Sequence, residues 1–159
     1  MPRSFCRAFL VIASLSLASA ALAADGGADP RTAAPATASD PVYRRAMVEV
    51  KAGRFAAAIP LLADVVARDP TNADAFNNLG YSHRKLGQRE QALTYYAEAL
   101  RLDPKHLGAL EYQGELFLEL NDLPRAEANL DLLGRLCGRC ESYEDLAEAV
   151  VAYKARPRT

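Results

Sequence analysis

The chain has 159 residues, of which 19 are Lys or Arg and 20 are Asp or Glu, so its formal net charge at pH 7 is −1. This length predicts a single folded domain, and the near-neutral balance provides no basic surface for nucleic acid or for an anionic membrane. Three cysteines are too few for a disulfide-dense miniprotein.

The first 23 residues have the three parts of a cleavable secretory signal peptide. Arg3 and Arg7 precede an apolar stretch over residues 8–20, and residues 21–23 form a small-x-small cleavage site. The alternative is a transmembrane anchor, but the apolar stretch is shorter than the roughly 20 residues that a spanning helix needs. We therefore expect a periplasmic protein, with an extracellular location as the alternative, and no membrane span in the mature chain.

Residues 24–40 contain Ala, Gly, Pro, Thr and Asp but no large apolar side chain. Such a segment cannot bury enough surface to offset the entropy lost on ordering. It is predicted to be a disordered Ala/Pro/Gly-rich linker, so the folded domain is expected over residues 41–159.

The folded part repeats every 34 residues. Asp69–Pro70 and Asp103–Pro104 have this spacing, and so do Gly53 and Gly87. Four further sets of small or apolar residues share it: Ala46, Gly80 and Gly114; Ala58, Ala92 and Ala126; Leu62, Tyr96 and Leu130; Val65, Ala99 and Leu133. Six aligned sets do not arise by chance, and a fixed period of this length indicates a repeat architecture.

Each unit has the pattern of two helices joined by a tight turn. In the second unit Phe76, Leu79, Gly80 and His83 recur at i, i+3, i+4 and i+7, which is one face of a helix. Gly87 suits the left-handed position that ends this helix. His83 lies on the apolar face and is predicted to be packed.

Capping signals fix the ends of several predicted helices. Thr71 or Asn72 is expected to cap the first helix of the second unit, and Pro124 falls near the first position of a helix, where its missing N–H costs little. A seventh helix is expected over about residues 142–155, with Ser142 and Asp145 as a weak capping box.

The second unit also carries seven residues at positions typical of one repeat family: Phe76, Leu79, Gly80, Ala92, Tyr96, Ala99 and Pro104. With these residues it closely resembles a tetratricopeptide repeat. The resemblance implies an all-α fold of three helical hairpins, at about residues 39–72, 73–106 and 107–140, that form a right-handed superhelical array. The seventh helix then resembles the C-terminal capping helix that such arrays need at an open end.

No pattern in the chain points to catalysis. It has no Gly-rich phosphate loop, no His-containing zinc motif and no nucleophile with a plausible base. We expect neither an enzyme nor a bound cofactor or metal. His106, at the start of a predicted helix, is expected to be exposed.

Cys137 and Cys140 are the two cysteines expected in the mature chain, since Cys6 lies in the predicted signal peptide. Cysteines three residues apart across a turn can reach disulfide geometry, and a disulfide that pins the seventh helix to the third repeat is the favoured interpretation. A redox site normally has its attacking cysteine at a helix N-terminus, whereas Cys137 ends a predicted helix. A metal site remains a third interpretation, although two thiolates are too few for a closed zinc site.

The resemblance further implies that the first helix of each hairpin lines a concave groove. The groove residues carried over in this way are Tyr43, Met47, Asn77, Asn78, Tyr81, Arg84, Lys85, Glu111, Tyr112 and Glu115. Family members that clamp a C-terminal carboxylate use Lys and Asn, then Asn, then Lys and Arg in successive repeats. Only Asn78 matches this set, and Gly108 and Tyr112 stand where the last two cations would be, so that clamp is expected to be absent.

These observations favour a non-catalytic, exported adaptor that binds a protein or peptide partner through its groove. Two alternatives from other classes remain. One is a periplasmic thiol-redox or metal-handling protein that uses Cys137 and Cys140. The other is a structural subunit of a cell-envelope complex.

Overall fold

A computed structural model describes residues 40–157 of the chain. The predicted signal peptide and all of the predicted linker except Asp40 lie outside the described residues. Asp40 itself is the N-cap of the first helix, where its carboxylate accepts a hydrogen bond of 2.7 Å from the backbone N–H of Val42. The ordered domain therefore begins one residue before the expected boundary.

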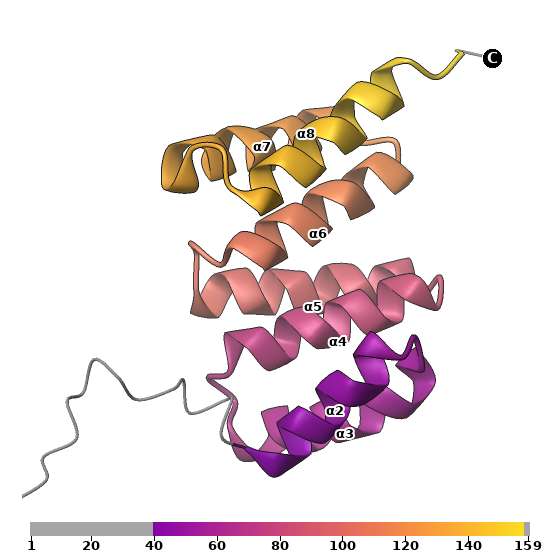
Figure 1. The fold of residues 1–159 in the computed structure, drawn as a ribbon, viewed down its shortest axis with the longest axis vertical. Coiled ribbons are helices and arrows are strands. Elements are labelled where there is room, and N and C mark those ends of the chain that lie inside the picture. Colours follow the sequence, from indigo (N-terminus) through magenta and orange to yellow (C-terminus); the bar gives the residue numbers. More distant parts are fainter. Residues whose placement is uncertain (1–39, 158–159) are drawn as a thin grey trace, which may run out of the picture. The chain divides into compact units, whose positions relative to one another are not determined.

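The described residues form seven helices and no strands, which confirms the predicted all-α class (Figure 1). The helices are α2 (Pro41–Lys51), α3 (Phe55–Arg68), α4 (Ala73–Lys85), α5 (Arg89–Leu102), α6 (Leu107–Glu119), α7 (Leu123–Cys137) and α8 (Glu141–Lys154). None of them is long and apolar enough to cross a membrane.

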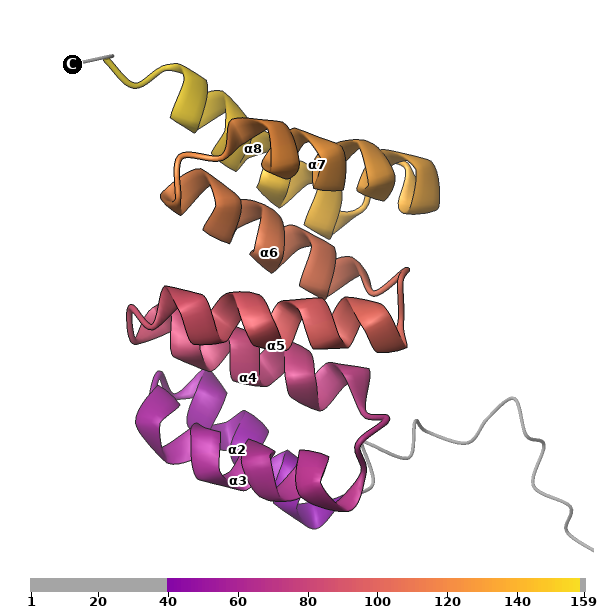
Figure 2. The same ribbon diagram turned by 180° about the vertical axis from the view of Figure 1, so that it is seen from behind.

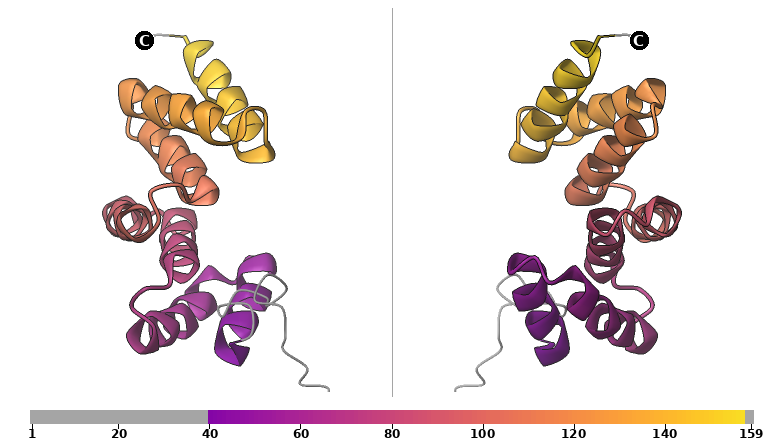
Figure 3. Two further views of the ribbon diagram at one scale, coloured as in Figure 1. Left: turned by 90° about the vertical axis from the view of Figure 1, so that its left-hand side faces the viewer. Right: turned by 90° about the vertical axis from the view of Figure 1, so that its right-hand side faces the viewer.

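The helices pair as three hairpins, α2 with α3, α4 with α5 and α6 with α7, while α8 packs on both α6 and α7. Each second helix also contacts the first helix of the next hairpin. The views from the front and from behind place α2, α4, α6 and α8 on one side and α3, α5 and α7 on the other (Figures 1 and 2). Figure 3 shows the same two layers edge-on.

Short-range hydrogen bonds explain where the helices begin and end. The Asn72 side chain accepts from the backbone N–H of Ala75 at 2.9 Å, as predicted for a cap of α4. Gly53 and Gly87 end α2 and α4 with positive φ, and Asn121 has a φ of 61° one period later. Asn is the residue that tolerates this left-handed conformation best after Gly.

The hairpins pack closely because small residues face large ones. A Cβ atom placed on Gly80 of α4 would lie 2.6 Å from the ring of Tyr96 on α5, and Tyr96 is fully buried. A Cβ atom placed on Gly114 of α6 would likewise lie 2.5 Å from the side chain of Leu146 on α8. The last contact docks α8 onto the third hairpin.

The start of α8 differs from the prediction. The helix begins at Glu141, and its N-cap, Cys140, makes no side-chain capping hydrogen bond. Ser142 is already inside the first turn and hydrogen-bonds to Glu111 of α6. The expected capping box of Ser142 and Asp145 is therefore absent, because Cys140 rather than Ser142 holds the N-cap position.

Candidate peptide-binding face

The first helices of the repeats, α2, α4 and α6, together with α8, form one continuous surface, which we call the first-helix face (Figure 3). The predicted groove residues all come from three of these helices. Tyr43 and Met47 lie on α2, residues 77, 78, 81, 84 and 85 lie on α4, and residues 111, 112 and 115 lie on α6.

Three half-buried tyrosines follow one another across this face. The Asn78 side chain donates to the hydroxyl of Tyr43 at 3.0 Å and to the backbone carbonyl of Asp74 at 2.8 Å. The ring of Tyr81 lies 4.9 Å from that of Tyr112, measured between centroids. One contact thus joins α2 to α4 at Tyr43, and another joins α4 to α6 at Tyr81 and Tyr112. We call Tyr43, Tyr81 and Tyr112 the tyrosine row.

Neighbouring groups hold the tyrosine row in place. Phe55 at the start of α3 packs edge-on against Tyr81, with centroids 5.7 Å apart, and the Lys85 ammonium lies 5.1 Å from the Tyr81 centroid. Burial is the main reason that the pKa of Tyr43 and of Tyr112 rises to about 12. Both hydroxyls therefore stay neutral at physiological pH and can donate as well as accept hydrogen bonds.

An open apolar pocket of about 430 Å³ adjoins this row at α2. It is lined by Tyr43, Arg44, Met47, Val48 and Lys51. Val48, in this lining, keeps 58% of its surface exposed. This end of the first-helix face can therefore accept an apolar group.

Arg84 is held inside the array. Its side chain is only 10% exposed, and its guanidinium pairs with Glu115 and, at 2.8 Å, with Glu119 of α6. Glu119 also pairs with Arg89 at 3.2 Å. The two members of the predicted basic pair thus differ: Lys85 is exposed, whereas the charge of Arg84 is compensated between α4 and α6.

Two predicted groove residues are buried beneath the face. Asn77 is 6% exposed, and its Oδ1 has no hydrogen-bond partner among residues 40–157. Glu111 is 7% exposed and is covered by α8, where Ser142 is its hydrogen-bond partner. Neither side chain offers much surface to a ligand, because the neighbouring helix lies over each of them.

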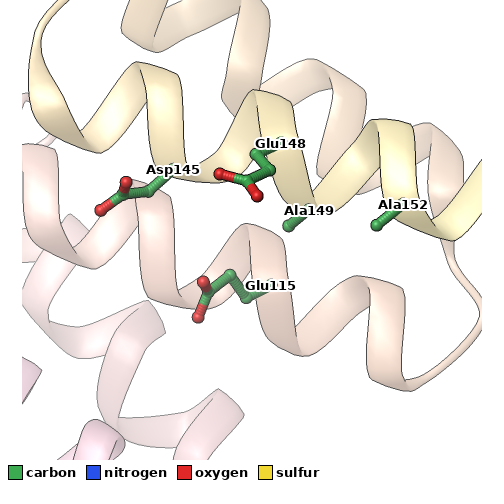
Figure 4. Close-up of a pocket in the computed structure, with 5 residues that line it drawn as sticks. All are labelled: Glu115, Asp145, Glu148, Ala149 and Ala152. Carbon is green, nitrogen blue, oxygen red and sulfur yellow. The ribbon is translucent and has the colours of Figure 1, made fainter.

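Sequence reasoning missed a further part of the face, between α6 and α8. A pocket of about 350 Å³ is lined there by Glu115, Asp145, Glu148, Ala149 and Ala152, which we call the α6–α8 pocket (Figure 4). A smaller hollow of about 210 Å³ continues from it past Glu119 to Arg156. The helix α8 was expected only to cap the array, yet it begins one 34-residue period after α6. The period itself could have identified it as a further first helix.

His106 is a second residue that the structure treats differently from the prediction. Its side chain is 13% exposed rather than open to solvent. The ring is the N-cap of α6, where Nδ1 accepts from the backbone N–H of Ala109 at 3.1 Å and Nε2 lies 3.1 Å from the carboxylate of Asp74. His83, predicted to be packed, stacks on Tyr95 with centroids 5.0 Å apart.

Cys137 and Cys140 flank the turn between α7 and α8. Their sulfur atoms lie 2.05 Å apart and their Cα atoms 5.7 Å apart. Gly138 between them has a φ of 68°, which lets the chain reverse within three residues. No group of three or more metal-ligating side chains gathers anywhere in the described part of the chain.

Comparison with known families agrees with this architecture. Two family models of the tetratricopeptide repeat match the chain, one over residues 43–88 and the other over residues 73–106. The chain is a tetratricopeptide-repeat protein. None of these matches indicates an enzyme family, and the matched regions cover both helices of the second hairpin and most of the first.

Curated relatives share only short segments with this tetratricopeptide-repeat protein. The CTR9 homolog of Arabidopsis thaliana is 31% identical over 78 residues, which is 49% of this chain and 7% of that one. The uncharacterized protein ycf37 of Pyropia yezoensis is 32% identical over 59 residues, which is 37% of this chain and 33% of that one. This chain therefore spans a small part of either relative.

Solved structures resemble a larger share of the repeat array. The type III secretion translocator chaperone SycD of Yersinia enterocolitica has a TM-score of 0.65 and 20% identity, over 71% of this chain and 81% of SycD. The second repeat domain of human RPAP3, in complex with an HSP70 peptide, has a TM-score of 0.64 and 20% identity, over 72% of this chain and 93% of that domain. At this level of identity the likeness shows the fold.

Proposed function

We propose that this tetratricopeptide-repeat protein is a non-catalytic adaptor that binds a peptide segment of a partner protein along its first-helix face. The observation that carries the proposal is the tyrosine row, which spans α2, α4 and α6, together with an open pocket at Tyr43 and a second pocket between α6 and α8. Tyrosines held by their neighbours provide large contact area at a low entropic cost.

Relatives of the same fold support this use of the surface. SycD has been solved in complex with a peptide of the translocator YopD, and RPAP3 in complex with an HSP70 peptide. A rigid array that presents its binding groups before the peptide arrives loses little conformational freedom on binding. The engagement of Arg84 with Glu115 and Glu119 argues against a clamp for a C-terminal carboxylate.

The test is a selection of peptides from a random displayed library on the purified domain, followed by titration of the selected peptides. The double variant Met47→Glu/Lys85→Glu changes the first-helix face at side chains that are at least partly exposed. Its matched control, Gln91→Glu/Arg101→Glu, makes the same change of net charge at exposed positions of α5. We expect the first variant to bind the selected peptides at least about tenfold more weakly and the control to bind them like the wild type.

A partner that both variants bind equally would move the interface to the second helices or to the ends of the array. That result would favour the structural-subunit alternative. Enrichment of no peptide by the wild-type domain would refute the peptide-binding proposal.

We further propose that the protein is exported to the periplasm, that residues 1–23 are removed, and that Cys137 and Cys140 form a structural disulfide. The signal-like sequence of residues 1–23 and the placement of Cys137 and Cys140 on either side of one turn support this. Intact-mass measurement of the protein from a bacterial envelope fraction, with and without reduction before alkylation, tests all three parts. An N-terminus at Met1 or two free thiols would contradict it.

A further inference from the structure

We propose that the α6–α8 pocket binds a Lys or Arg side chain of the peptide that lies on the first-helix face. This inference rests on the proposed function and adds the class of side chain that the peptide must present. It follows from the shape of the pocket, from the charges that line it and from one buried carboxyl group below it.

The shape of the pocket fits a long side chain with a charged end. Glu115 comes from α6, and Asp145 and Glu148 come from the facing side of α8, so carboxylates of two helices border one space (Figure 4). Ala149 and Ala152 line the same space without any polar side-chain atom. The aliphatic stem of Lys or Arg can lie on such a surface while its charged end meets carboxylates.

Two of the three carboxylates that line the pocket lack an ion-pair partner within the described chain. Neither Asp145 nor Glu148 has an ion-pair partner there, and Glu115 shares Arg84 with Glu119. Several other carboxylates of the described residues, by contrast, have an arginine beside them. Glu49, Glu98 and Asp122 each lie 2.5–2.7 Å from a nitrogen of a neighbouring arginine.

A buried carboxyl group next to the pocket points to the same missing cation. Glu111 is more than nine-tenths buried between α6 and α8, is hydrogen-bonded by Ser142, and has no basic partner in the described residues. Glu115 and Asp145, which line the pocket, are among the carboxylates whose charge acts on it. A buried acid surrounded by acids ionises only at a cost in free energy, which a positive charge brought to the pocket would reduce.

The surroundings also distinguish a side chain from a metal ion. No cluster of three or more ligating groups at metal-binding geometry exists in residues 40–157, so the carboxylates are spread around the pocket rather than gathered on one point. Arg84 and Arg156 line the continuation of the pocket at its other end. A peptide cation is therefore attracted to the Asp145 end and repelled from the Arg156 end, which fixes where along the face the basic residue must lie.

The direct test uses two small probes and heteronuclear NMR on the full domain. The first probe is N-acetyl-lysine methylamide and the second is its norleucine analogue, which has the stem without the charge. We expect saturable shifts of the Ala149 and Ala152 amide signals with the lysine probe alone. Equal shifts with both probes, or none with either, would overturn the inference whatever the selected peptides show.

The second test uses the peptides enriched in the selection. We expect a Lys or Arg at one fixed position, and replacing that residue by norleucine should weaken binding about fivefold or more. The variant Asp145→Asn/Glu148→Gln should lose the preference for the basic residue. The control Glu90→Gln/Asp131→Asn, which removes the same charge from exposed positions of α5 and α7, should keep it.

The Lys/Arg site and the peptide-binding function are refuted by different results. Suppose that the enriched peptides have no basic residue but bind the Met47→Glu/Lys85→Glu variant more weakly than the wild type. This result would refute the Lys/Arg site and would leave the peptide-binding function supported. If the Glu90→Gln/Asp131→Asn control loses as much binding as Asp145→Asn/Glu148→Gln, the effect depends only on the net charge of the domain. That result would also refute the site.

Discussion

The ring of Tyr96 on α5 lies directly on the backbone of Gly80 on α4, in the space that a Cβ atom would occupy. Tyr96 is fully buried, so its ring has no room to withdraw. This contact sets how closely the two helices of the second hairpin approach, and that hairpin stands between the other two.

Gly80→Ala should therefore destabilise the domain. Overpacking of this kind costs about 1–3 kcal/mol, which outweighs the gain of about 1 kcal/mol from replacing Gly in a helix. The matched control is Gly108→Ala, because a Cβ atom there would lie 3.5 Å from its nearest neighbour, at ordinary contact distance. Urea unfolding followed by circular dichroism should show a lower midpoint for the first variant and an equal or higher one for the second.

Glu111 should make the stability of the domain depend on pH. Burial is the main reason that its pKa rises to about 7, with a smaller effect from Glu115, Asp145 and Glu141. The unfolded chain releases this proton near its ordinary pKa, whereas the folded chain holds it up to about pH 7. The contribution of Glu111 to the free energy of unfolding is therefore highest in acid. It falls by about 3 kcal/mol in total as the pH rises from the ordinary pKa of Glu to above about 7.

Glu111→Gln removes this titration. Unfolding free energies measured from pH 4 to pH 8 should fall for the wild type and change less for the variant, which should be the more stable of the two at pH 8. The groups that face Glu111 are Glu115 and Tyr112 on α6 and Glu141 and Asp145 on α8. An identical pH profile for both proteins would contradict the assignment to Glu111.

A bound basic peptide should reduce the free-energy cost of ionising Glu111. Because a cation near the α6–α8 pocket favours the ionised form of Glu111, binding should release protons near neutral pH. Calorimetry of a selected Lys-containing peptide in two buffers of different ionisation enthalpy measures this release. Affinity should rise between pH 6 and pH 8 for the wild type and stay level for Glu111→Gln.

His106→Ala should weaken the junction between the second and third hairpins. The substitution removes the ring nitrogen that caps α6 and the contact with Asp74 on α4. Loss of an N-cap costs about 1 kcal/mol. His106→Asn keeps a capping acceptor and should recover most of the loss in thermal unfolding; equal losses for both would show that the cap contributes nothing.

Removal of the pair Cys137 and Cys140 by double substitution with Ser should lower stability while leaving the repeat fold intact. The closed loop is very short, so the chain-entropy contribution is about 2 kcal/mol. Peptide affinity at the tyrosine row, which lies on α2, α4 and α6, should be unchanged. A large loss of affinity with an unchanged unfolding midpoint would favour the thiol-based alternative.

Much of the fold could be predicted from the sequence, because the signals that set it are local or periodic. Asn72, Gly87 and Pro124 lie where their backbone preferences require them, at the start or end of a helix. The short turn at Gly87 also predicted the pairing of α4 with α5, with Gly80 as a small residue that lets the two helices pack closely.

The contacts between repeats could not be predicted in the same way. Whether Arg84 faces solvent or Glu115 depends on how far one hairpin is rotated against the next, and no local pattern encodes that rotation. The same applies to Ser142, whose hydroxyl meets Glu111 only because α8 docks on α6. The groove residues Asn77 and Glu111 were placed on the correct helices, but their burial depends on the helix that covers them.

Within the described residues α8 is the last helix, and its main contacts are with α6 and α7. Free energies of local opening follow the number of buried contacts that must be broken. We expect the amide hydrogens of α8 to exchange faster than those of α4 or α6. One side of the α6–α8 pocket would then open and reclose while the rest of the array stays folded, so the residence time of a ligand in this pocket would be set by the undocking of a single helix.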